Sequence, residues 1–156
     1  MKVRVIAVGT RLPAWVNESF EDYARRLRAD TPLQLQQLPT ARRSGGGAAK
    51  RAMAEEARAM LALLGPRDHV VALDERGMQY STKQLSSWLA KRLASGQDLA
   101  LLIGGPDGLA EAVLARAAER WSLSQLTLPH GMVRVIVAEQ LYRAATVLAG
   151  HPYHRT

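Results

Sequence analysis

The sequence predicts an α/β domain built on a mostly parallel sheet flanked by helices. Short runs of β-branched or apolar residues alternate with longer segments of helical periodicity along the whole chain. The 156 residues are enough for one domain with a sizeable core. No internal repeat and no Gly-, Pro- or Ser-rich linker divides the sequence, so we expect a single domain over residues 1–156.

The first quarter of the chain predicts a strand, a helix and a second strand. Residues 2–9 (KVRVIAVG) are rich in β-branched side chains and indicate a buried strand. Residues 13–28 place apolar side chains at helical spacing, and Pro13 suits the first turn of a helix. Residues 33–38 alternate Leu and Gln, which is typical of a strand with one wet face.

The middle of the chain begins with a flexible basic loop, residues 42–47 (RRSGGG). The Ala-rich residues 48–64 predict a helix, which Gly65-Pro66 closes. Residues 69–73 (HVVAL) indicate a short buried strand, and residues 74–77 (DERG) a charged turn after it.

The second half repeats the same alternation. Ser81 or Thr82 suits the N-cap of a helix, and Gly96 suits its end. Residues 132–149 could start as a strand, but their length and later helical spacing favour a helix. The predicted elements are helices 81–94, 109–118 and 132–149, and strands 98–103 and 121–128.

Composition limits the possible functions. The chain has 21 Lys and Arg against 14 Asp and Glu, a net charge of +7. Such an excess favours a polyanionic partner such as nucleic acid, although an Arg-rich genome composition would produce the same charge. The absence of cysteine excludes disulfides, thiolate catalysis and Cys-ligated zinc, and it fits a cytoplasmic protein. No signal-peptide pattern or run of about 20 apolar residues indicates export or a membrane span.

Three predicted strands lead into segments that could hold a ligand, because ligands of open α/β sheets bind at the carboxyl ends of strands. The segments are Leu73-Asp74, residues 104–108 (GGPDG) and residues 123–130. Paired glycines let a ligand approach the backbone, although Pro-Asp-Gly alone is explained by a turn. The glycines match neither the dinucleotide fingerprint nor the P-loop.

The end of the chain carries unusual chemistry. His154, Tyr153 and Arg155 offer a titratable base, a stacking surface and a fixed cation, directly after a long helix. No His-x-x-x-His pattern or carboxylate cluster has metal-ligand spacing, and His151 with His154 is only a weak candidate, so we expect no metal site. Glu55-Glu56 is interpreted as the surface charge of a solvated helix.

Two features near the last helix remain open between structural and functional interpretations. His130 could cap this helix or touch a ligand. Arg134 and Arg143 are nine residues apart and point to opposite sides, since a helix has about 3.6 residues per turn. One of them could therefore face a substrate or a partner subunit while the other is surface charge.

Several motifs together resemble one family. They are VIAVGT at 5–10, LIGGPDG at 102–108, WSLS at 121–124, LTLPH at 126–130, VR at 133–134, EQLYRA at 139–144 and HPYHR at 151–155. In this order, and over a chain of this length, they resemble the RlmH family of SPOUT methyltransferases.

The resemblance implies a homodimeric enzyme with a C-terminal trefoil knot, a topology that general rules of chain connection would exclude by default. It implies methyl transfer from S-adenosylmethionine to N3 of a pseudouridine in helix 69 of 23S ribosomal RNA, within the assembled ribosome. The cofactor-binding residues that it implies are Leu73, Gly104, Gly105, Leu123, Ser124, Gln125, Leu126, Thr127 and Leu128.

The reaction suggests roles for the C-terminal residues. We predict that His154 is the base or proton relay, that Arg155 holds the anion or a phosphate, and that Tyr153 stacks on the base. Alternatively the tail only clamps the substrate, and water takes the proton. The predicted RNA contacts are Arg25, Arg26, Arg42, Arg43, Lys50, His130, Arg134 and Arg143.

Two other functions fit the same motifs. One is a SPOUT enzyme for another RNA nucleotide, because the cofactor motifs do not name the base. The other is a non-catalytic RNA-binding or ribosome-associated factor. The intact His154-Arg155 pair argues against this second alternative.

Overall fold

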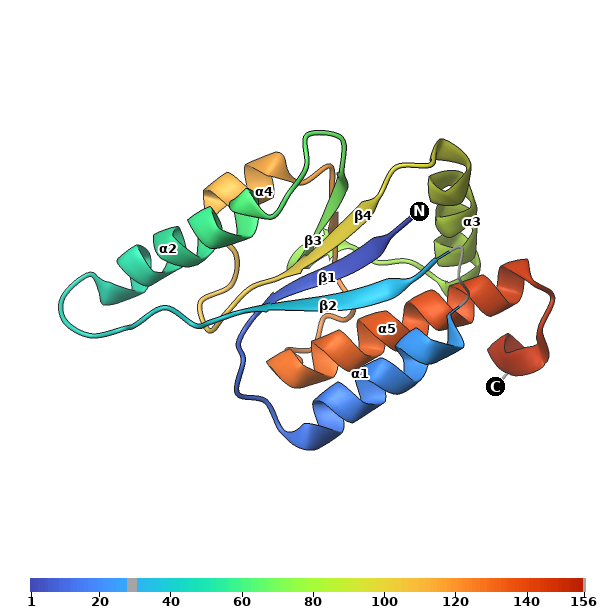
Figure 1. The fold of residues 1–156 in the computed structure, drawn as a ribbon, viewed down its shortest axis with the longest axis horizontal. Coiled ribbons are helices and arrows are strands. Elements are labelled where there is room, and N and C mark those ends of the chain that lie inside the picture. The colour runs from blue at the N-terminus through green and yellow to red at the C-terminus, as the bar shows by residue number, and fades with distance from the viewer. Residues whose placement is uncertain (28–30, 156) are drawn as a thin grey trace.

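The protein forms one five-stranded sheet with helices on both faces (Figure 1). The structure, a computed structural model, describes residues 1–27 and 31–155. The strands lie in the order β2-β1-β4-β3-β5, and every neighbouring pair is parallel, which confirms the predicted α/β architecture. The strands are β1 (Val3–Val8), β2 (Leu33–Leu38), β3 (His69–Met78), β4 (Leu99–Ile103) and β5 (Glu119–Trp121). The helices are α1 (Ala14–Arg26), α2 (Ala48–Ala62), α3 (Thr82–Ser95), α4 (Glu111–Arg116), α5 (His130–Leu148) and the 3-10 helix η1 (Pro152–Arg155).

The core lies on both faces of the sheet because successive strand side chains point to opposite sides. Val5 and Ala7 of β1 pack into the cluster that α1, α3 and α5 cover. Ile6 and Val8 pack into the cluster under α2 and α4. The central strands are therefore buried on both faces, which is why they read as continuous apolar runs in the sequence.

The turn predicted at residues 74–77 is wrong, since β3 continues to Met78 with an irregular register after Leu73. The glycine in this segment explains the extension. A Cβ on Gly77 would lie 2.5 Å from the carbonyl carbon of Arg120, so only glycine lets this part of β3 lie so close to β5.

The strand predicted at residues 121–128 is also wrong beyond its first residue. β5 covers only Glu119–Trp121, and a loop follows. The Ser122 hydroxyl donates to the Ser124 carbonyl at 2.9 Å, and the Leu126 amide donates to the Ser124 hydroxyl at 2.9 Å. These local bonds replace the ladder bonds that a strand would need.

The last helix, α5, begins at His130, two residues before the predicted start. The chain turns at Gly150, where φ is +70°, and η1 folds back onto the end of α5. Figure 1 shows this tail at the end of α5 that is remote from the strand carboxyl ends. The predicted end of the first helix, at residue 28, lies outside the described residues. Within the described part of the chain, no helix is long and apolar enough to span a membrane.

Candidate active site

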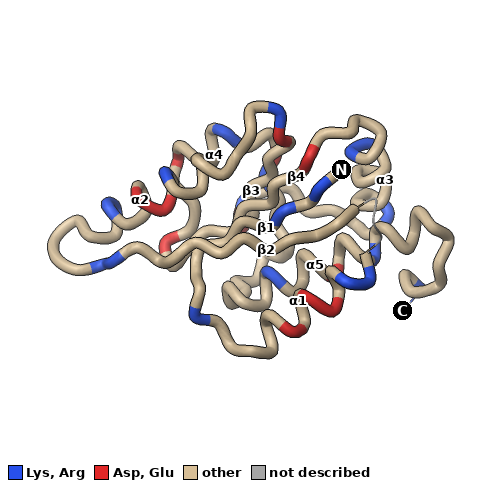
Figure 2. Tube along the Cα trace, viewed as in Figure 1, with Lys and Arg blue, Asp and Glu red and all other residues tan. Residues whose placement is uncertain are grey.

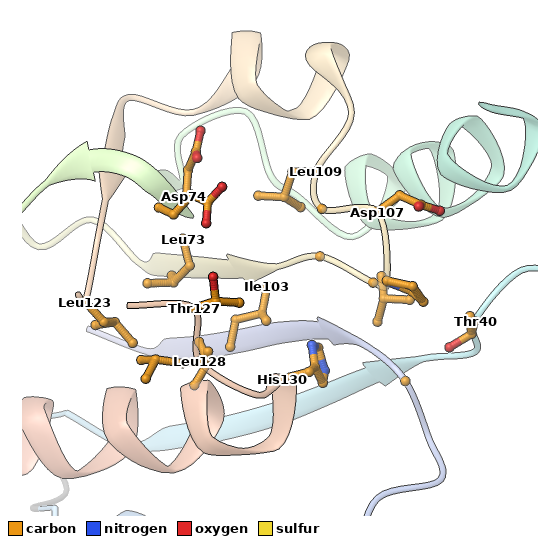
Figure 3. A pocket seen from close by; sticks show the side chains of 18 of the residues that line it. Thr40, Leu73, Asp74, Ile103, Asp107, Leu109, Leu123, Thr127, Leu128 and His130 are labelled. Carbon is orange, nitrogen blue, oxygen red and sulfur yellow. The ribbon is translucent and has the colours of Figure 1, made fainter. Parts of the chain in front are cut away.

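A cavity of about 1130 Å³ lies where the strands end (Figure 3). It brings together the three segments that the sequence singled out, because they lie at the edge where β4 and β5 end and where the register of β3 becomes irregular after Leu73. Gln125 is exposed and is not part of its lining. The other predicted cofactor residues line it, namely Leu73, Gly104, Gly105, Leu123, Ser124, Leu126, Thr127 and Leu128.

The loop that follows β4 forms one wall of the cavity and is tightly wound. The Gly108 amide donates to the Gly105 carbonyl at 3.0 Å. A Cβ on Gly104 would lie 2.5 Å from the carbonyl carbon of Gly108 and 2.9 Å from the Leu109 nitrogen. Only glycine fits at position 104, and the loop offers its backbone rather than side chains to a ligand.

Asp74 is a wall residue that the sequence singled out only as part of the ligand-binding segment Leu73-Asp74. Its Oδ1 accepts a hydrogen bond from the Arg76 amide at 3.0 Å. Its Oδ2 is buried and accepts no hydrogen bond from the described residues, while Arg120 Nη1 lies 4.0 Å away as an ion-pair partner. Buried polar atoms nearly always have a partner, so this oxygen suits a ligand hydroxyl or ammonium group. Its position directly after the apolar run of β3 was the available signal.

Arg134 is fully buried beneath the cavity and does not contact solvent. Its guanidinium donates to the Gln37 side chain at 2.8 Å, to the Gly9 carbonyl at 2.8 Å and to His130 Nε2. Burial lowers the pKa of Arg134 to about 10, so the group stays charged at neutral pH. The prediction that Arg134 contacts RNA is therefore wrong, because its side chain spans the core between α5 and the ends of β1 and β2.

His130 lines the cavity from the first turn of α5 (Figure 3). Arg134 donates to its Nε2, and the ring also hydrogen-bonds the backbone of Gly104. Burial, and then the charge of Arg134, lower the pKa of His130 below its ordinary value. We infer a neutral ring that carries its proton on Nδ1.

We expect the ring of His130 to titrate at a pH below its ordinary pKa of 6.5, which an NMR titration of its ring nitrogens measures. Its native pKa lies below the ordinary 6.5, so the unfolded chain takes up the proton first. Because the unfolded state then binds more protons than the folded state, His130 lowers the free energy of unfolding as the pH falls through 6.5 toward the native pKa. His130→Gln should remove that part of the pH dependence. A ring that titrates near 6.5 would contradict the assignment.

The C-terminal residues pack on α5 far from this cavity. The Tyr153 hydroxyl donates to Glu139 Oε1 at 3.0 Å, and its ring centroid lies 4.7 Å from that of Tyr142. Arg143 donates to Glu139 at 2.6 Å and lies 5.0 Å from the centre of the Tyr153 ring. Burial, followed by hydrogen bonds to Tyr23 and Glu139, raises the pKa of Tyr153, so its hydroxyl stays protonated.

His154 and Arg155 are the tail residues with the fewest restraints. His154 Nδ1 is buried without a hydrogen-bond partner among the described residues, and Arg155 is exposed. The tail therefore holds Tyr153 in place while it leaves the exposed guanidinium of Arg155 available to another molecule.

The structure does not bring His154 to the cavity of its own chain. The 19 residues of α5 span about 28 Å, at 1.5 Å per residue. The cavity lies at the first turn of this helix, beside His130, and the tail lies at the other end. A base in the tail and a cofactor in the cavity could meet only if two chains contribute.

The predicted RNA contacts differ in their surroundings. Arg42 and Lys50 are exposed, on the loop before α2 and in its first turn, where Figure 2 shows basic residues. Arg25 and Arg26 are exposed beside Asp22, at 3.8 Å and 2.8 Å. The four RNA contacts stay predictions.

The surface-charge interpretation fails for one of the two adjacent glutamates of α2. Glu55 is exposed as expected, but Glu56 is buried, with 5% of its side chain exposed. It accepts hydrogen bonds from the Ala41 amide and from Arg43. Arg43 is therefore bound within the protein.

A parallel sheet with helices on both faces, and a cavity at the carboxyl ends of its strands, define an α/β protein built to bind a ligand at that edge. A family model described as "Predicted SPOUT methyltransferase" matches residues 1–154. The chain belongs to the SPOUT methyltransferase family, which confirms the resemblance seen in the sequence. The family relation implies the use of S-adenosylmethionine.

Curated relatives match the whole chain. The ribosomal RNA large subunit methyltransferase H of Hahella chejuensis is 50% identical over 155 residues, which cover 99% of both chains. The protein of that name from Methylococcus capsulatus is also 50% identical, over 99% of this chain and 100% of the relative. A solved structure of a probable methylase family protein from Haemophilus influenzae has a TM-score of 0.57 at 11% identity, and the match covers 97% of this chain and 69% of that one. This last likeness concerns the fold alone.

Proposed function

We propose that this chain methylates N3 of a pseudouridine in helix 69 of 23S ribosomal RNA, with S-adenosylmethionine as methyl donor. The observation that carries the proposal is the cavity at the strand ends, walled by the Gly104 loop. The curated relatives, named as ribosomal RNA large subunit methyltransferases, support ribosomal RNA as the substrate. The base and its position come from the family resemblance, as does a trefoil knot at the C-terminus.

The residues around the cavity fit the proposed cofactor. A ligand could approach the backbone at Gly104 because no side chain stands there. Leu73, Leu123 and Leu128 offer apolar contact for an adenine ring. Asp74 Oδ2, which lacks a donor, suits a ribose hydroxyl or the amino group of the methionine part. When bound, S-adenosylmethionine supplies a sulfonium methyl that the nitrogen nucleophile displaces in line.

The C-terminal tail, residues 151–155, is proposed to carry out the proton transfer and to stabilise the anion. The imide N–H must lose its proton, and His154 is the proposed base or relay. Arg155 would stabilise the resulting anion or hold a neighbouring phosphate, and Tyr153 would stack on the base. If the tail only clamps the RNA, water takes the proton instead.

The separation of tail and cavity supports a homodimer. Because the cavity lies at the first turn of α5, while the tail packs on this helix between Glu139 and its C-terminal end, we propose that the tail of one chain completes the cavity of its partner. A dimer would also present more surface to a large RNA target. We propose further that the protein is a single domain and acts in the cytoplasm on the assembled ribosome.

A direct test combines binding and product mapping. Calorimetry should detect binding of S-adenosylmethionine to the isolated protein. Primer extension and mass mapping should find the N3 methyl group absent from ribosomal RNA of cells that lack this protein. Normal methylation in those cells would contradict the proposed substrate, and absence of cofactor binding would contradict the activity.

We expect Arg42→Gln combined with Lys50→Gln to weaken binding of a helix 69 hairpin. Removing two phosphate contacts should also reduce the slope of log affinity against log salt by about 1.5 to 2. Fluorescence anisotropy over a series of salt concentrations measures both. Lys91→Gln, at an exposed position of α3, is the control for the loss of one positive charge elsewhere on the surface. An unchanged slope in the double variant would mean that neither residue contacts phosphate.

A further inference from the structure

A cluster of three charged side chains joins the basic loop before α2 to the cavity wall. Arg43 donates to Glu56 through two nitrogens, at 2.7 Å and 3.0 Å. Its Nε donates to Asp107 Oδ2 at 2.8 Å. Asp107 belongs to the loop after β4 and lines the cavity (Figure 3). We call Arg43, Glu56 and Asp107 the Arg43 cluster.

The hydrogen bonds of Arg43 leave little capacity for RNA. Besides the carboxylates, Nη1 donates to the Ala41 carbonyl at 2.9 Å. Four of the five N–H donors of the guanidinium are thus used inside the protein. One guanidinium and two carboxylates give the cluster a net charge of −1, which disfavours an approaching phosphate. The hydrogen bonds to Glu56 and Asp107 raise the pKa of Arg43, so it stays charged.

The Arg43 cluster contacts the loop after β4 at two points. A methyl group at Gly105 would lie 3.1 Å from Glu56 Oε1, so the Gly105 backbone packs against this buried carboxylate. Two residues further on, the Asp107 carboxylate is bound by Arg43. Arg43 itself is fixed by its ion pair with the buried Glu56, which is costly to break. The loop between Gly104 and Gly108 is therefore held by the Glu56 carboxylate at Gly105 and by the more exposed ion pair of Asp107 with Arg43.

We propose that Arg43 is a positioning residue for the cofactor, which together with Glu56 holds Asp107 and so keeps residues 104–108 in the shape that accepts S-adenosylmethionine. This rests on the proposed function, in which the cavity binds that cofactor. Arg43 acts on the cofactor through the backbone of this loop. This positioning role takes the place of the RNA contact that the sequence suggested for Arg43.

Cofactor affinity and the mobility of the loop test this role. Asp107→Asn weakens the link to Arg43 and leaves the buried Arg43–Glu56 pair intact, so the variant should fold. We expect about tenfold weaker S-adenosylmethionine binding by calorimetry, because a displaced loop misplaces its ligand contacts. We also expect faster hydrogen exchange of the loop amides in the free protein. Asp107→Glu should retain most of the affinity, since its carboxylate can still reach Arg43.

A double variant separates an action through Arg43 from a direct contact of Asp107 with the cofactor. Arg43→Ala should weaken cofactor binding at least as much as Asp107→Asn does. Adding Asp107→Asn to Arg43→Ala should then cost little more, because both changes break one link. Fully additive losses would overturn the proposed link.

Matched controls are available on the same helix. Glu55 and Arg58 are exposed on α2, so Glu55→Gln and Arg58→Ala should keep cofactor affinity within about twofold. If Arg43→Ala binds S-adenosylmethionine normally but binds the RNA hairpin weakly, Arg43 is an RNA contact and the inference is wrong. If the unaltered protein does not bind S-adenosylmethionine, the proposed function fails, which is a distinguishable result.

Discussion

Replacing Gly104 by alanine should abolish S-adenosylmethionine binding, with an affinity loss of at least about 100-fold in calorimetry. The added methyl carbon would lie 2.5 Å and 2.6 Å from the carbonyl carbon and oxygen of Gly108. These are backbone atoms, so no rotation of a side chain relieves the clash. The turn must open, and the backbone wall of the cavity moves with it.

Gly46→Ala is the control for this substitution, because nothing lies within 4 Å of the position its methyl group would occupy. This variant should bind the cofactor normally. Far-ultraviolet circular dichroism should show an intact sheet in both variants, since residue 104 lies outside β4. Normal cofactor binding by Gly104→Ala would mean that the cofactor does not use this wall, and would place its site elsewhere.

The position of the cavity could be predicted from the sequence because it follows from connectivity. Parallel strands that alternate with helices end at one edge, so the segments after Leu73, Ile103 and Trp121 had to converge. The conformation of the last segment could not be predicted in the same way. Its alternating Ser and Leu residues match a strand, but the hydroxyls of Ser122 and Ser124 bond locally instead.

Depth of burial was the other quantity that the sequence could not supply. Spacing placed Arg134 and Arg143 on opposite sides of a helix, but it did not indicate that Arg134 points into the core. Glu55 and Glu56 are adjacent and identical in the sequence, and only the packing of α2 buries Glu56. Periodicity gives the direction of a side chain, whereas its surroundings depend on elements distant in the sequence.

Mixing two inactive variants should restore methylation if the tail of one chain serves the cavity of its partner. Gly104→Ala lacks a cofactor site, and Arg155→Ala lacks the proposed anion-stabilising cation. Removal of such a group costs about 100- to 1000-fold in rate. A mixed dimer would contain one cavity with both defects and one intact cavity with an intact tail. Random mixing makes half of the dimers mixed, so about a quarter of the wild-type activity should return in a two-fold symmetric dimer.

The same experiment excludes a site formed within one chain, because every chain in the mixture carries one of the two defects. Affinity tags of two kinds isolate the mixed dimer, in which one of the two sites is intact, so it should have about half of the wild-type rate. Transfer of labelled methyl to ribosomes from cells that lack this protein measures the rate. Each variant mixed with itself is the control and should stay inactive. No recovery in a verified mixed dimer would contradict the shared site, and full activity of Arg155→Ala alone would remove Arg155 from the chemistry. Recovery would mean that α5 acts as a spacer, since the cavity lies at its first turn and the tail packs between Glu139 and its C-terminal end.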